Sequence, residues 1–202
     1  MCRKLCLVAL LLCFVAGTAN AGLLITAIAR SNSDKTAPAI AGPLANGSLA
    51  YVDRTHIYQE LPAYLLGADY VKVANDDRDI NIGTGYMLDV TLARDCTLYL
   101  MIDTRVGDTV KADPATIGPN AMFWVQVFGW TYTGDTASID ESANGSIDSW
   151  FSVYKKDVLA GTTRLYEQRE GGINMYGVAA VPEPATIALL GLGALTLLRR
   201  KK

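Results

Sequence analysis

Apolar and polar residues alternate with the period of a β-strand in the middle of the chain. Within residues 86–93, Leu88, Val90 and Leu92 alternate with Asp89 and Thr91. This spacing places the three apolar side chains on one face, as in a sheet with one buried side. Amphipathic helical periodicity is nearly absent from the same region.

Further segments have the composition of strands, because they are short, rich in β-branched and aromatic residues, and separated by Gly, Asp, Asn and Pro. A strand is also expected near the start of the middle region, and the rest of that stretch, to residue 48, is predicted to be a loop. The pattern predicts an all-β fold with a single antiparallel β-sandwich. The predicted strands are 23–29, 86–93, 96–103, 122–132, 150–154 and 172–181.

The first 21 residues have the three parts of a secretory signal peptide: two cations, an apolar run over residues 5–15, and a small-x-small site formed by Ala19 and Ala21. The apolar run would cover only ~16 Å of a ~30 Å hydrocarbon core as a helix, too short for a lasting anchor. We therefore expect signal peptidase to remove this signal helix, so that the mature chain begins at Gly22.

The C-terminus carries a second targeting pattern, in which Pro182, Glu183 and Pro184 precede an apolar run over residues 185–198. Two prolines favour an extended segment, and the apolar run would form a helix of ~21 Å, which can insert if the bilayer thins. The cations that follow are expected to stay in the cytoplasm, leaving the domain outside. These cations are Arg199, Arg200, Lys201 and Lys202.

This tail resembles the sorting domain of PEP-CTERM proteins, in which a Pro-Glu-Pro motif, an apolar helix and a basic end occur in the same order. The resemblance implies recognition of residues 182–184 by exosortase, a membrane protease. It also implies export, transient anchoring by a transmembrane sorting helix, and release to the cell surface or extracellular matrix. The predicted organisation is a signal peptide at 1–21, a sandwich domain at 22–178 and a sorting tail at 179–202.

Charge and cysteine content narrow the functions of the middle region. The two ends contain six of the 18 basic residues and one of the 20 acidic residues, which leaves 12 basic and 19 acidic residues and a net charge near −7. An acidic domain without a basic cluster argues against nucleic acid as a partner. Cys96 is the one cysteine outside the leader, and its apolar surroundings predict a buried thiol.

A set of short segments in the middle region resembles β-sandwich modules appended to secreted polysaccharide-degrading enzymes. This second resemblance implies a jelly-roll-like sandwich with affinity for carbohydrate. The segments that carry it are 60–62, 66–71, 74–77, 97–100, 103–105, 152–154, 160–162 and 175–178.

No catalytic motif is evident. His56 is the one histidine, no Gly-x-Ser-x-Gly motif accompanies it, and a partly exposed strand position is the expected setting for it. We predict no catalytic residue and no firm metal site. A calcium ion is a candidate ligand for Asp76, Asp77 and Asp79, which lie in one expected loop, although the spacing of a known calcium loop is missing.

Trp124 and Trp130 are the candidate ligand-binding residues, since an even separation would place them on one face of a strand. Asp103 and Arg105 could add polar contacts to the same ligand. The alternative for the tryptophans is that they are buried in the core, and the alternative for Arg105 is that it forms a structural ion pair. Two functions remain open. The first is a non-enzymatic surface or matrix protein that binds exopolysaccharide, and the second is a carbohydrate-active enzyme, a glycosidase or lyase, with paired acidic residues.

Overall fold

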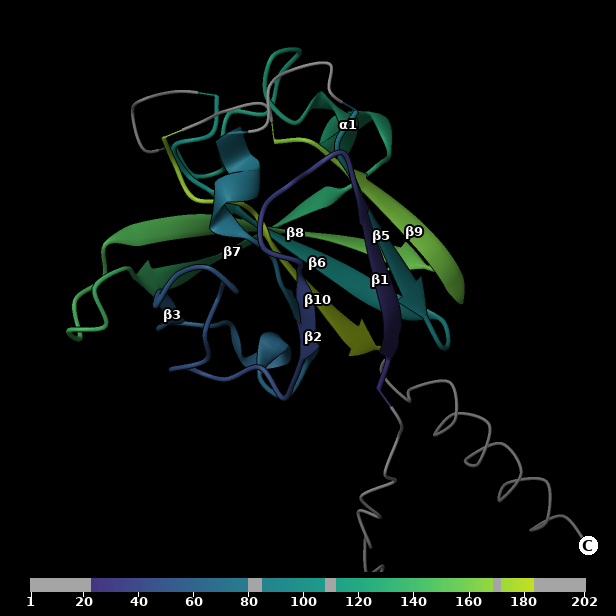
Figure 1. Ribbon diagram of the computed structural model, residues 1–202, viewed down its shortest axis with the longest axis horizontal. Helices are drawn as coiled ribbons and strands as arrows, with labels where there is room; N and C mark the ends of the chain where they lie inside the picture. The colour runs from purple at the N-terminus through teal and green to yellow at the C-terminus, as the bar shows by residue number, and fades with distance from the viewer. Residues whose placement is uncertain (1–22, 80–84, 108–111, 169–171, 184–202) are drawn as a thin grey trace, which may run out of the picture.

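Two antiparallel sheets pack against each other as a sandwich in the computed structural model (Figure 1). The structure describes residues 23–79, 85–107, 112–168 and 172–183. The predictions for the signal segment with Gly22, for Pro184, for the apolar run 185–198 and for the basic end 199–202 lie outside these residues. Within them, no helix is long and apolar enough to span a membrane.

The small sheet has the order β1-β5-β9 and the large sheet the order β2-β4-β10-β6-β8-β7-β3 among the described residues. In the small sheet the bounds are β1 Ile25–Ser31, β5 Met87–Leu92 and β9 Gly161–Tyr166. In the large sheet they are β2 Ala39–Ala41, β3 Ile57–Tyr58, β4 Asp69–Lys72, β6 Cys96–Asp103, β7 Thr131–Asp140, β8 Ser149–Val158 and β10 Gly177–Pro182. The helical elements are η1 Ala63–Leu65, η2 Asn75–Asp79 and α1 Phe123–Val127.

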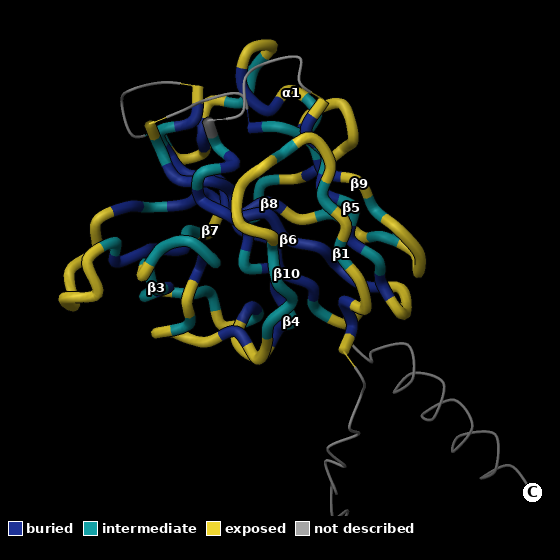
Figure 2. Tube along the Cα trace, in the orientation of Figure 1, coloured by how far each residue is buried: buried dark blue, intermediate teal, exposed yellow. Residues whose placement is uncertain are grey.

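The all-β antiparallel sandwich predicted from the sequence is confirmed. In β5, Leu88, Val90 and Leu92 are buried and alternate with half-buried neighbours, as the period of two requires. In β6, by contrast, all eight residues are buried, Cys96 among them, because other parts of the chain cover both faces of this strand (Figure 2). Part of that cover is Tyr64 of η1, whose ring stacks on Tyr99 at 5.1 Å.

The strand predicted over residues 122–132 is wrong for residues 122–130, whereas Thr131 and Tyr132 begin β7. The segment begins with Met122 in the left-handed region, forms the single turn of α1, and closes with a bond from Phe128 N to Trp124 O of 2.9 Å. Gly129 then adopts a φ of 73°, which reverses the chain toward β7. The aromatic and β-branched composition favoured a strand, but such propensities are weak and the packing of the rings overrides them.

Two other expectations are corrected by the sheet pairing. Residues 39–41, predicted to be loop, form β2 because they pair with β4, which the local composition does not signal. His56 does not belong to a strand but lies just before β3, and it is half-buried.

The last strand, β10, lies in the interior of the large sheet, between β4 and β6. It pairs with β6 from Gly177 to Pro182 and with β4 over residues 178–180. The folded domain therefore extends four residues beyond the predicted boundary at 178. Pro182, which lacks a backbone donor, occupies the end of the strand, where β4 no longer pairs with it.

We predict that residues 22–183 fold alone, whereas residues 22–176, which lack β10, do not. Removing an interior strand breaks two ladders and exposes the paired edges of β4 and β6, a loss comparable to the ~5–15 kcal/mol stability of a domain. Circular dichroism melting should show a cooperative transition for the longer form and none for the shorter. A cooperative transition in the shorter form would contradict this assignment.

Candidate functional site

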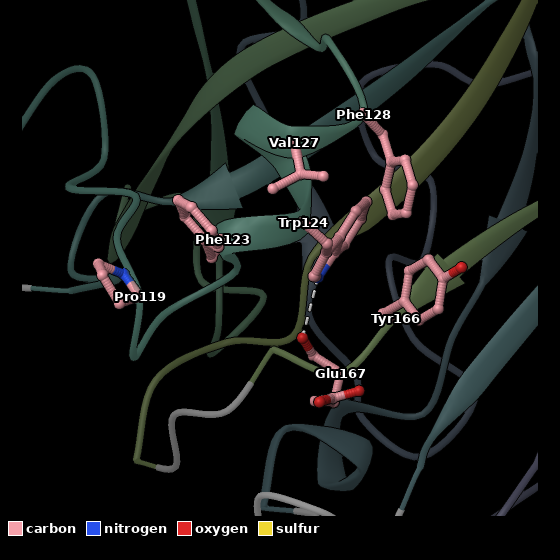
Figure 3. A pocket seen from close by; sticks show the side chains of 7 residues that line it. All are labelled: Pro119, Phe123, Trp124, Val127, Phe128, Tyr166 and Glu167. Atoms are coloured by element: carbon pink, nitrogen blue, oxygen red, sulfur yellow. Dashed lines mark hydrogen bonds between the residues drawn. The ribbon is translucent and has the colours of Figure 1, made fainter.

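An aromatic pocket of about 300 Å³ opens beside α1 and the end of β9. Figure 3 shows the side chains that surround it, with rings contributed by both elements. Phe123 and Phe128 are 45% and 43% exposed, so this apolar surface faces solvent. The lining residues are Pro119, Phe123, Trp124, Val127, Phe128, Tyr166 and Glu167.

The single turn of α1 divides its side chains between the pocket and the core. Phe123 and Val127 are four residues apart and therefore lie on the same side of the helix, at the pocket. Val125 points the other way and is buried. A strand with the same sequence would have placed all three of these residues on one face, so the helix is what separates the buried Val125 from the two residues at the pocket.

Trp124 is held in one orientation by its neighbours. Its indole nitrogen donates a 3.0 Å hydrogen bond to the backbone carbonyl of Glu167 (Figure 3). Its ring meets Trp130 edge-on at 6.3 Å and Tyr176 at 5.9 Å. Trp130 is only 8% exposed and does not line the pocket. The two tryptophans thus touch each other, but they do not share a strand face as predicted.

The other side of the pocket is a stacked pair that the sequence analysis missed. The rings of Phe128 and Tyr166 are 5.4 Å apart with an interplanar angle of 15°. Phe128 follows α1 and Tyr166 ends β9, so 38 residues of chain separate them and no local pattern pairs them. Their proximity is decided by the packing of α1 against the small sheet.

A second, polar pocket of about 150 Å³ contains the other candidate side chain, Arg105. Its lining comes from separate parts of the chain: the segment before β3, the start and middle of η2, the turns after β6 and β7, and the segment before β10. The lining residues are Arg54, His56, Asn75, Arg78, Arg105, Glu141, Gly172, Ile173 and Asn174.

Asp103 and Arg105 form a bidentate ion pair. Arg105 Nε donates to Asp103 Oδ1 at 2.9 Å, and its Nη2 donates to Asp103 Oδ2 at 2.6 Å and to Ser149 Oγ at 3.0 Å. The hydrogen bonds to Asp103 raise the pKa of the Arg105 guanidinium. Asp103 is fully buried and also accepts the backbone N–H of Asn174. The predicted group of four residues therefore divides between two places: Trp124 lines the aromatic pocket with Trp130 packed behind it, and Arg105 lines the polar pocket with Asp103 buried beneath it.

Glu141 and His56 are the titratable groups of the polar pocket. Burial lowers the pKa of His56, and its buried Nδ1 has no hydrogen-bond partner in the part of the chain that the structure describes. Burial acts to raise the pKa of Glu141, but hydrogen bonds from Ser149 and Asn174 and the charge of Arg105 hold it below its usual range.

Two of the carboxylates proposed to bind calcium, those of Asp76 and Asp77, instead bind different side chains of the protein. Asp77 is buried and accepts bonds from Arg30 at 3.0 Å and Ser33 at 2.6 Å. Asp76 pairs with Arg54. The side chain of Asp79 lies outside the description, and the described residues contain no group of three metal-ligating side chains. The calcium hypothesis remains a prediction.

The sorting motif begins where the sheet ends. Pro182 closes β10, and both Pro182 and Glu183 are exposed. Because β10 is interior, the motif is joined directly to the core of the domain without an intervening linker. The exposed backbone after β10 is therefore the first stretch that a protease can reach without dismantling the sheet.

Comparison with known families matches residues 180–202 to the PEP-CTERM protein-sorting motif. Neither the curated proteins nor the solved structures contain a match to the chain. The matched segment includes all three motif residues, the apolar run and the basic end. The chain therefore carries a PEP-CTERM sorting tail and is an exported protein, anchored transiently at the membrane and processed by exosortase.

Proposed function

We propose that the sandwich is a non-catalytic carbohydrate-binding domain, displayed at the cell surface or in the extracellular matrix, which holds exopolysaccharide in its aromatic pocket. The observation that supports this most is the open pocket formed by Trp124, Phe128 and Tyr166. The tail delivers the domain to the compartment in which such polymers occur.

Several physical properties of the pocket suit a sugar ring. The apolar C–H face of a sugar can pack on an aromatic face, and the rings here are already ordered by mutual contacts, so little conformational entropy is lost on binding. Its volume of about 300 Å³ is at the lower end of the ~300–1,000 Å³ range of ligand pockets. The Glu167 side chain also lines the pocket, and a carboxylate is a hydrogen-bond acceptor for hydroxyl groups (Figure 3).

The acidic content of the pocket favours binding over hydrolysis. Glycosidases use two carboxyl groups about 5–10 Å apart across the scissile bond. Among the described residues that line the aromatic pocket, Glu167 is the one acid. A single carboxylate can orient a hydroxyl group, but it does not provide both the acid and the base or nucleophile of the usual mechanism.

The first test is the replacement of Phe128 or Tyr166 by Ala. Removing one stacking face should weaken binding to the host exopolysaccharide about tenfold, equivalent to about 1.4 kcal/mol. Affinity gel electrophoresis measures this. Leu159→Ala is the matched control, because Leu159 is 77% exposed and does not line the pocket. Equal retardation of all variants would contradict the proposal.

The second test separates binding from catalysis. Incubation with the same polysaccharide should release no reducing ends and no unsaturated products above those of a heat-inactivated sample. Release of either product that is abolished by Glu167→Gln or Glu141→Gln would instead establish the alternative, a glycosidase or lyase.

The third test addresses the tail. Replacing Pro182, Glu183 and Pro184 by Ala should leave export unchanged but make the full-length chain accumulate in the membrane, because a helix extended toward the end of β10 hides the peptide bonds that follow the strand. The folded domain should be retained, since Pro182 is at the exposed end of β10. Pulse-chase labelling in the host follows processing. An unchanged rate would show that the three residues do not direct it.

A further inference from the structure

The polar pocket concentrates positive donors in an otherwise acidic domain. Arg54, Arg78 and Arg105 line it together with one carboxylate, that of Glu141. The domain around it has a net charge near −7, since its 19 acidic residues exceed its 12 basic ones. The lining of this pocket thus has the opposite sign to the domain as a whole.

Carboxylates around the pocket orient Arg54 and Arg105, but they do not use all the N–H groups of the two guanidiniums. Arg105 uses Nε and Nη2 on Asp103 and Ser149, which leaves the two N–H groups of Nη1. Arg54 donates from Nη1 to the carbonyl of Asp53 and from Nη2 to Asp76, which leaves its Nε. The guanidinium is planar with five N–H groups, so a held guanidinium can still bind a planar carboxylate.

His56 adds an unsatisfied polar atom at the same place. Its Nδ1 is buried and unpartnered in the described structure, and an unpaired buried polar group costs about 1–3 kcal/mol. The Tyr51 ring packs against the imidazole edge-on at 5.6 Å and restricts its rotation.

The charge balance disfavours a multiply charged anion. Asp53, Asp76 and Asp103 lie around the arginines, and Glu141 faces the pocket, so these four carboxylates offset the charge of the three guanidinium groups. This arrangement is less suited to the two charges of a phosphate than to the single charge of a carboxylate. The volume of about 150 Å³ accommodates such a group while the remainder of its molecule stays outside.

We infer that the polar pocket is a second binding site, which takes the carboxylate group of an acidic ligand. A uronic acid residue of a polysaccharide and a free organic acid share this chemistry. The inference does not rest on the aromatic pocket, which shares no lining residue with this one. The two sites are connected, however, since Gln168, next to Glu167, donates to the carbonyl of Asn174 at 3.0 Å.

Equilibrium dialysis of the full chain in detergent with radiolabelled glucuronate tests the inference. Bound glucuronate should be displaced by unlabelled glucuronate and by acetate, but not by glucose, which lacks the carboxylate. Displacement by acetate as strong as that by glucuronate assigns the site to free organic acids, and stronger displacement by glucuronate assigns it to a uronic acid residue. Displacement by glucose, or no binding of glucuronate, would overturn the inference.

Two variants localise the binding. Arg54→Gln should weaken glucuronate binding about tenfold, whereas Arg164→Gln, which breaks a comparable ion pair with Asp89 on the small sheet, should leave it unchanged. Glu141→Gln keeps an oxygen acceptor for Ser149 and Asn174 but removes a negative charge, so it should strengthen binding severalfold. A gain of affinity cannot arise from misfolding. Equal affinities for Arg54→Gln and Arg164→Gln, or no gain for Glu141→Gln, would overturn the assignment.

Phe128→Ala separates this inference from the proposed function. That variant should bind glucuronate with the affinity of the unmodified protein even though it loses affinity for exopolysaccharide. Parallel loss of both would show that glucuronate binds at the aromatic pocket, which would overturn the assignment of the carboxylate to the polar pocket.

Discussion

The pairing of β10 between β4 and β6 is the interaction on which the rest of the structure depends. The sheet is incomplete until the chain reaches Pro182, and the sorting motif begins at that residue. The core of the domain is therefore completed next to the membrane-directed tail. Processing within β10 would remove part of an interior strand, so we expect the retained product to keep this strand.

A buried polar network aligns the segment that leads into β10. Asn75 accepts the backbone N–H of Met175 at 2.8 Å, Asp103 accepts that of Asn174, and Gln168 accepts that of Tyr176. Each bond satisfies a backbone group that is buried before the ladder begins. The same side chains or their neighbours border the two pockets, so the contacts that position the last strand also position the candidate sites.

The two pockets differ in the physics they offer to a ligand. The aromatic pocket presents ordered rings to solvent, which favours shape and dispersion contacts with an apolar face. The polar pocket presents held guanidinium groups, which favours a planar anion. An acidic polysaccharide has both features in one chain.

The sequence by itself determined that the protein is exported with a sorting tail, because targeting signals are local patterns. It also determined the all-β class and the buried face of β5, because the alternation of Leu88, Val90 and Leu92 is a local pattern as well. It misplaced the segment 122–132, since one turn of helix and a strand share the same aromatic composition. It also predicted that Asp103 and Arg105 share one binding site with the tryptophans. The alternative that Arg105 forms an ion pair had been left open. Only the tertiary structure decided that Phe128 meets Tyr166 and that Arg54 lies near Arg105. These contacts link residues tens of positions apart, and no local periodicity encodes which distant segments pack together.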